Sequence, residues 1–185
     1  MPPGAPQRRV GGRARSQNGG VPIERCSQCG FDSDGWSDAT AVEAIGRLPG
    51  QWAAATGGLD AEALVRRPIS GMWSIGEYTD HVREVLFGMR FVLDSAAADS
   101  GIDLGDAPRG LFTPEPRPID VPFALEGIDR EARALVDRLT AMPSSSWNAT
   151  AMIGGTEVDA HWIARHAVHD ATHHLGDVAQ LRAAL

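Results

Sequence analysis

The feature that most restricts the fold of this chain is a helix start near its middle. Ser74 and Glu77 are spaced as a capping box, and Trp73 precedes them at the position of a hydrophobic staple. Over residues 75–97 the apolar side chains fall on one stripe of a helix, and His81 lies at the edge of that stripe. The pattern predicts a long helix that packs through one face. The stripe consists of Tyr78, Val82, Val85, Leu86, Met89, Val92 and Leu93.

The same periodicity predicts three more helices. The first covers residues 38–56 and should be kinked or split at Pro49-Gly50, because proline lacks the N–H that a helix interior needs. Another ends before Pro143, and the last runs from about residue 159 to the C-terminus. The apolar residues of the helix before Pro143 are Leu125, Ile128, Ala132, Leu135, Val136 and Leu139.

Two segments between these helices are predicted to be irregular. Residues 98–121 contain four prolines and form a long connection, a kind of loop that is often functional. Residues 144–157 are rich in turn formers, with a short hairpin predicted around Gly154-Gly155. Four amphipathic helices with one long crossover predict an all-α fold, a four-helix bundle.

The chain divides into three parts. Residues 1–22 combine four arginines with glycine, proline and polar residues, and this composition predicts a disordered tail that is dispensable for folding. Residues 23–37 hold both cysteines of the chain and form a small separate segment. Residues 38–185 form the bundle, a single domain of ordinary size.

Charge and hydropathy exclude some classes of partner. The chain has 17 basic residues, all arginine, against 24 acidic ones, and its net charge is −7. An acidic body disfavours nucleic-acid binding, because phosphates require clustered cations. No apolar run is long enough for a membrane span or a signal peptide, so we expect a cytoplasmic protein that acts on a small molecule. A homodimer is the macromolecular assembly that remains open.

Five of the six histidines fall in residues 161–174, within the last helix. Asp170 and His174 are four positions apart and border the core-facing stripe, so they can share a metal ion. His81 on the second long helix is the only histidine outside the cluster and can supply a third ligand. Three ligands leave an open coordination position, as in catalytic metal sites. The structural alternative is that His81 is a hydrogen-bonded residue at the core edge.

A second set of ligands lies on the neighbouring face of the same helix. His169 and His173 have the H-x₃-H spacing, and Cys26 and Cys29 form a C-x-x-C pair followed by Gly30, as in a zinc knuckle. Together they complete a Cys₂His₂ tetrahedron, which predicts a structural zinc site. An exposed histidine pair with unpaired or redox-active cysteines is the alternative.

These motifs resemble those of the DinB-like superfamily of metal-dependent four-helix bundles. Residues 73–81, Trp-Ser-Ile-Gly-Glu-Tyr-Thr-Asp-His, resemble the family's entry to its second helix. The last helix is similar to the family pattern of a histidine, then an acid or histidine four residues later, then a histidine, then a polar residue. The resemblance covers residues 38–185. The residues that match the last-helix pattern in order are His166, Asp170, His174 and Asp177.

The resemblance extends to a subgroup with an N-terminal C-x-x-C-G-F-D segment and His-Asp-x-x-His-His in the last helix. Here these motifs are Cys26–Asp32 and His169–His174. The superfamily implies a metal triad of His81, Asp170 and His174, which His166 and Asp177 would support or line. Because Asp170 stands where histidine or glutamate is commoner, a triad of His81, His169 and His173 stays open.

The function that the resemblance implies is metal-dependent chemistry on a small molecule. Members include S-transferases that use thiols such as mycothiol or bacillithiol, and a thiol-dependent maleylpyruvate isomerase. We therefore expect one catalytic and one structural Zn²⁺, with Ni²⁺ or another divalent metal as an alternative at the catalytic site, and a low-molecular-weight thiol as cosubstrate. The alternatives are a hydrolase or isomerase, and a non-catalytic, zinc-stabilised binding module.

Overall fold

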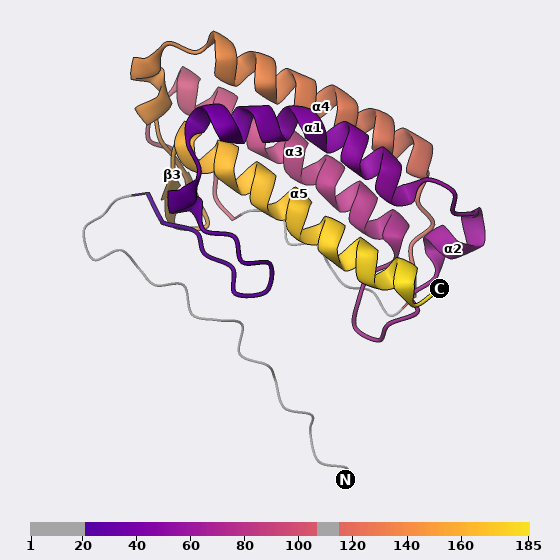
Figure 1. Cartoon of the computed structure of the whole chain (residues 1–185). Coiled ribbons are helices and arrows are strands. Elements are labelled where there is room, and N and C mark those ends of the chain that lie inside the picture. The colour runs from indigo at the N-terminus through magenta and orange to yellow at the C-terminus, as the bar shows by residue number, and fades with distance from the viewer. Residues whose placement is uncertain (1–20, 107–114) are drawn as a thin grey trace.

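The structure is a computed structural model that describes residues 21–106 and 115–185. Four long helices form a bundle (Figure 1), as the sequence predicts. None of the helices in the described ranges has both the length and the apolar content needed to cross a bilayer. The helices are α1 (Asp38–Thr56), α2 (Ala61–Val65), α3 (Ile75–Ala98), α4 (Val121–Ala141) and α5 (Ala160–Ala183). The strands are β1 (Ile102–Asp103), β2 (Ala151–Ile153) and β3 (Thr156–Val158), and short 3₁₀ turns cover Ser33–Gly35 and Ser144–Asn148.

The bundle is arranged so that α1 and α3 each pack on both α4 and α5. The diagonal pairs are therefore α1 with α3 and α4 with α5. Apolar stripes from all four helices meet along the axis and bury aliphatic side chains completely. The largest fully buried apolar side chains are Trp52, Ile45, Leu48, Ile75, Leu86, Leu93, Ile128, Leu135, Leu139, Ile163 and Leu181.

The helix that the capping box predicts begins where expected. Ser74 Oγ accepts a hydrogen bond from Glu77 N at 3.2 Å, and Glu77 Oε2 accepts one from Ser74 N at 2.9 Å. Asp159 caps α5 in a similar way, because its Oδ1 accepts a hydrogen bond from Trp162 N at 2.8 Å. These caps fix the start of the two helices that carry the histidine cluster and His81.

Three details of the fold differ from the sequence prediction. The helix α1 continues through Pro49 and is not split, because Leu48 and Trp52 on either side of the proline are both fully buried and anchor it to the core. The five-residue helix α2 was not predicted, since it is too short to show helical periodicity. Strand β1 lies within the predicted long connection.

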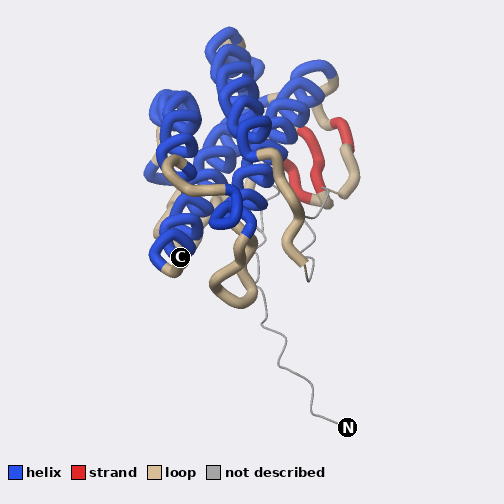
Figure 2. Tube along the Cα trace, turned by 90° about the vertical axis from the view of Figure 1, so that its right-hand side faces the viewer, coloured by secondary structure: helices blue, strands red, loops and turns tan. Residues whose placement is uncertain are grey.

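A small sheet covers one end of the bundle (Figure 2). The predicted hairpin is confirmed: β2 and β3 pair antiparallel, and Gly154 and Gly155 both have the positive φ that its tight turn requires. Strand β1 adds to β2 in parallel, which ties the connection after α3 to the hairpin before α5. Residues 1–20 of the predicted tail and residues 107–114 of the long connection lie outside the described residues.

The contact between α3 and α4 gives a first testable prediction. A Cβ at Gly127 would lie 2.6 Å from Arg83 Cγ, and Arg83 is held in place by an ion pair with Asp80 at 2.7 Å. We expect Gly127→Ala to destabilise the protein by about 1–3 kcal/mol, although alanine is the better helix former. The matched control is Gly88→Ala in α3, where the added Cβ meets nothing within 4 Å and should stabilise by about 0.5–1 kcal/mol. Urea unfolding measures both, and equal gains would contradict the packing described here.

Candidate metal centres

Helix α5 presents metal-ligating side chains on two neighbouring faces, each completed by another part of the chain. On the face toward α3, the ligand atoms of His81, Asp170 and His174 all lie within 4.8 Å of one another. We call this set the inner centre. On the adjacent face, a second set joins the N-terminal segment to α5, and its ligand atoms also lie within 4.8 Å of one another. We call this set the outer centre, and it consists of Cys26, Cys29, His169 and His173.

The inner centre is organised around one carboxylate oxygen. Asp170 Oδ1 lies 3.5 Å from His81 Nε2 and 3.9 Å from His174 Nε2. These separations are longer than ordinary hydrogen bonds, and Asp170 Oδ1 is buried with no hydrogen-bond partner among the described residues. They are close to the spacing of about 3.3–3.8 Å that ligands bonded at ~2.0–2.3 Å have around a tetrahedral metal. The donor set therefore fits a divalent cation.

The protonation of the inner centre also suits a cation. Burial raises the pKa of the Asp170 carboxyl, but His81, His174 and His166 outweigh it, and the net pKa lies below the ordinary value. Burial lowers the pKa of His174 against the pull of Asp170 and Asp177. An ionised carboxylate and a neutral imidazole are the forms that bind metals.

Asp177 and two aromatic rings position the inner ligands. Asp177 Oδ2 lies 2.7 Å from His174 Nδ1, which leaves Nε2 of that ring directed at Asp170. Trp73 packs against His81 with ring centroids 5.1 Å apart, and Tyr78 packs against His174 at 4.8 Å. Burial, with the charge of Asp177, raises the pKa of Tyr78 to about 12, so its hydroxyl keeps its proton.

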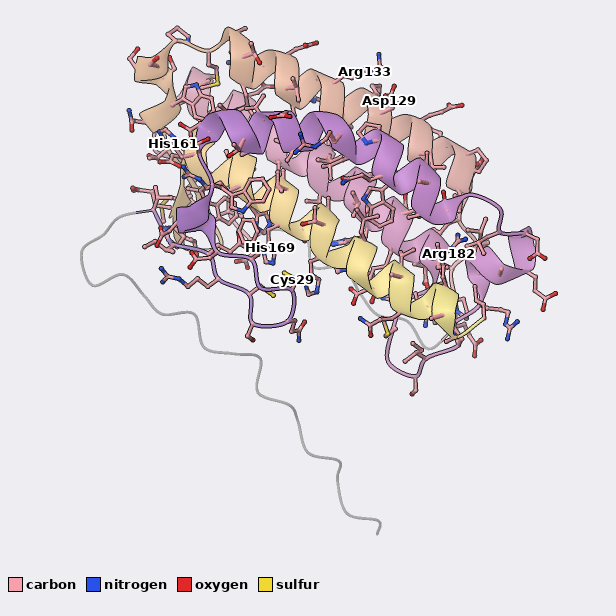
Figure 3. All side chains as sticks on the ribbon, in the orientation of Figure 1. Cys29, Asp129, Arg133, His161, His169 and Arg182 are labelled. Carbon is pink, nitrogen blue, oxygen red and sulfur yellow. The ribbon has the colours of Figure 1, made fainter. Side chains whose placement is uncertain are left out.

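The outer centre combines a turn of the N-terminal segment with the second histidine pair of α5, as Figure 3 shows for Cys29 and His169. Cys26 Sγ lies 3.7 Å from His173 Nδ1. Burial opposes ionisation of the Cys26 thiol, but hydrogen bonds from the backbone of Cys29, from His169 and from the backbone of Gln28 bring its pKa down to about 6. Two sulfurs and two imidazoles are the donor set of structural zinc.

Glu24 is a functional residue that the sequence did not reveal. Its carboxylate lies 2.8 Å from His169 Nδ1 and 3.0 Å from His166 Nδ1. Burial raises the pKa of Glu24, but these two histidines hold it down at about 2. Because the Glu24 carboxylate contacts Nδ1 of His169, Nε2 of the same ring points away from Glu24. That Nε2 atom is buried without a hydrogen-bond partner among the described residues.

The two supporting residues of the predicted triad have different places. Asp177 contacts His174 and lies 3.8 Å from His173 Nε2, so it stands between the two centres. His166 stacks on Trp162 at 4.3 Å and hydrogen-bonds Glu24, and it lines a cavity that Asp170 also lines. The alternative triad is not assembled: His169 and His173 gather with the cysteines, and among the described residues His81 gathers with Asp170 and His174.

A cavity of about 260 Å³ touches both centres. Most of its lining belongs to the outer centre and its neighbours, and Asp170 is the inner ligand that reaches it. The lining residues are Glu24, Cys26, Gln28, His166, His169, Asp170 and His173. The side chains of the three inner ligands keep about one fifth of their surface exposed: 22% for His81, 20% for Asp170 and 17% for His174. The three inner ligands are therefore partly open to solvent.

Comparisons with known proteins agree with this architecture. The DinB superfamily matches residues 44–178. Among solved structures, the chain is similar to YfiT from Bacillus subtilis, a probable metal-dependent hydrolase with an unusual four-helix bundle topology, with a TM-score of 0.68 at 10% identity over 79% of this chain and 86% of that one. Among curated proteins, no sequence matches the chain. The family match covers well over half of the sequence, and the chain belongs to the DinB superfamily.

Proposed function

We propose that the protein is a metal-dependent enzyme that transfers a low-molecular-weight thiol, of the mycothiol type, to an electrophilic small molecule. The observation that carries this proposal is the inner centre: His81 from α3 faces Asp170 and His174 from α5 beside a cavity. One carboxylate and two imidazoles are three ligands, and three ligands leave a position for a substrate atom. A divalent metal bound there lowers the pKa of a coordinated thiol or water.

The chain's own residues hold and shield this position. Asp170 supplies the negative charge of the ligand set, and Asp177 fixes the orientation of the His174 ring through its Nδ1. The ring of Trp73 packs against His81 and the ring of Tyr78 against His174. The raised pKa of Tyr78 keeps its hydroxyl neutral, so it does not act as a base. Substrate then approaches over the exposed parts of the three ligands.

A non-catalytic zinc-stabilised module is disfavoured by the position of His81. Such a module needs only the outer centre, because four protein ligands satisfy a structural zinc ion. It has no use for a third ligand that reaches Asp170 from the facing helix at 3.5 Å. Partly exposed ligands at a cavity are what an enzyme requires.

Hydrolysis is the second candidate, and the structural neighbour favours it. YfiT is described as a probable metal-dependent hydrolase and shares the fold with this chain. In that case water would take the open position in place of the thiol, and the same three ligands would hold the metal. The ligand set alone fits both reactions.

A paired assay separates the two reactions. Purified full-length protein is loaded with Zn²⁺ or Ni²⁺ and incubated with mycothiol, bacillithiol or no thiol, together with an electrophile such as monochlorobimane or with an activated ester. If the enzyme transfers a thiol, the electrophile should be consumed only when a thiol is present, and a chelator should stop this consumption. Metal-dependent ester cleavage without any thiol would favour the hydrolase. Equal rates before and after removal of the inner metal would contradict both reactions.

The matched control is His161→Ala, which should leave the rate unchanged. His161 also lies on α5, but it contacts Asp38 and belongs to neither centre.

A further inference from the structure

The N-terminal segment contains a tight turn that carries both cysteines. Cys26 N donates to Phe31 O at 2.9 Å, and Gly30 N donates to Cys26 O at 2.9 Å, so the chain reverses tightly around the two sulfurs. Gly30 has a φ of +76°, a left-handed conformation that glycine adopts without strain. Both cysteines are free thiols. The turn supplies two sulfur ligands and needs two more from elsewhere.

Helix α5 supplies those two. One ring nitrogen of each of His169 and His173 lies within 4.8 Å of both sulfurs, and Cys26 Sγ lies 3.7 Å from His173 Nδ1. His169 Nε2 is a buried nitrogen with no hydrogen-bond partner among the described residues, while Glu24 occupies the other nitrogen of the ring. A carboxylate behind a ligating histidine is the arrangement that fixes its tautomer and raises its basicity at metal sites.

We propose that Cys26, Cys29, His169 and His173 bind one Zn²⁺ in a closed structural site that fastens the N-terminal segment to α5. The proposal is independent of the reaction at the inner centre. Two thiolates with two imidazoles select zinc over magnesium or calcium, which prefer oxygen ligands. Binding releases the thiol protons to solvent. With four protein ligands the ion has no position left for substrate, so its role is structural.

The segment also packs on α5 through other contacts. Phe31 stacks on His169 with ring centroids 4.5 Å apart, and Arg165 Nε donates to Trp36 O at 2.9 Å. The cavity of about 260 Å³ lies at the proposed ligands, since Cys26, His169 and His173 line it. Zinc would therefore occupy part of this cavity and fasten the segment to α5, and Figure 1 shows the segment lying alongside that helix.

Another ligand set on the same helix competes with this assignment. Glu24, His166 and His169 also lie within 4.8 Å of one another. Glu24 contacts Nδ1 of both rings, so in that set it would bind the metal directly in place of the sulfurs. The two assignments differ in whether sulfur is a ligand, and this difference can be measured.

Cobalt substitution distinguishes sulfur ligands from a purely nitrogen and oxygen site. The intact, reduced chain is reconstituted with Co²⁺ in place of zinc, and its near-ultraviolet absorption is recorded for thiolate-to-cobalt charge transfer. We expect this band in the wild type and in His81→Ala, a weaker band in Cys26→Ser and in Cys29→Ser, and its loss when both cysteines are replaced. Ser27→Ala, between the two cysteines, is the matched control and should keep the band. A wild-type spectrum without the band would overturn the proposal, whether or not the inner centre binds metal.

Thermal unfolding provides the second measurement. Because the binding energy of a closed zinc site is folding energy, a chelator strong enough to remove both metals should lower the melting temperature of the wild type by at least about 5 °C. The Cys26→Ser variant starts lower and should respond less to the chelator. An equal response in both proteins, or a Cys26–Cys29 disulfide in protein purified and kept under reducing conditions, would overturn the proposal.

Discussion

Asp170→Asn is expected to lower metal affinity at the inner centre by more than 100-fold and to abolish metal-dependent activity. The substitution keeps the size of the side chain and removes the charge from the one oxygen that both His81 and His174 approach. Loss of a residue that only supports a ligand typically weakens metal binding by about 10–100-fold, so loss of a charged ligand should exceed that. Competition with a chromophoric chelator measures the affinity.

The control for this substitution is Asp129→Asn, which neutralises an exposed acid on α4 whose partner is Arg133. We expect it to change neither metal affinity nor activity, because exposed ion pairs contribute little. Circular dichroism should show unchanged helix content in both variants. If Asp170→Asn binds metal as tightly as Asp129→Asn, Asp170 is not a ligand.

Glu77→Gln is expected to destabilise the protein by about 3–5 kcal/mol, because it removes the charge of a buried carboxylate that Arg67 and two backbone N–H groups bond. Glu77 is 1% exposed and accepts from Arg67 Nε at 2.8 Å, from Ser74 N and from Arg117 N at 3.1 Å. One carboxylate thus joins the start of α3 to the segments on both sides of it. Urea unfolding measures the change. Glu43→Gln, which breaks the exposed pair with Arg47 on α1, is the control and should change stability by less than about 1 kcal/mol.

The same carboxylate predicts a dependence of stability on pH. Burial raises the pKa of Glu77, but the bonds from Arg67 and from the backbone of Ser74 and Arg117 bring it down from an ordinary 4.5 to about 2. A depressed pKa stabilises the folded state above pH 4.5, and this contribution is lost as pH falls from there through about 2. The difference in stability between wild type and Glu77→Gln should therefore shrink over that range. A constant difference would contradict this ion pair.

Residues on one helix could be placed from the sequence, because about 100° of rotation per residue fixes their relative directions. The pairs Asp170/His174 and His169/His173 therefore fall on the two neighbouring faces of α5 that the sequence predicts. The start of α3 was equally predictable, since its capping box is local chemistry. That His81 reaches Asp170 was a prediction about packing between helices, and the structure brings them to 3.5 Å.

The parts that the sequence could not supply lie where no periodicity exists. Glu24 and Phe31 belong to a segment whose only regular pairing is one bridge between Arg25 and Asp32, so nothing local shows which way their side chains point. For the same reason the hydrogen bond between His166 and Glu24 could not be predicted from the sequence. At Pro49 the local signal was misleading. Proline disfavours a helix interior, but the burial of Leu48 and Trp52 keeps α1 continuous there.

The most direct measurement is the metal content of the intact protein and of His81→Ala by elemental analysis after purification without chelators. We expect two divalent metal ions per chain in the wild type and one in His81→Ala, because His81 belongs to the inner centre. His161→Ala should retain both. If His81→Ala carries as much metal as the wild type and retains full activity, the inner centre is not the site where this protein binds its catalytic metal.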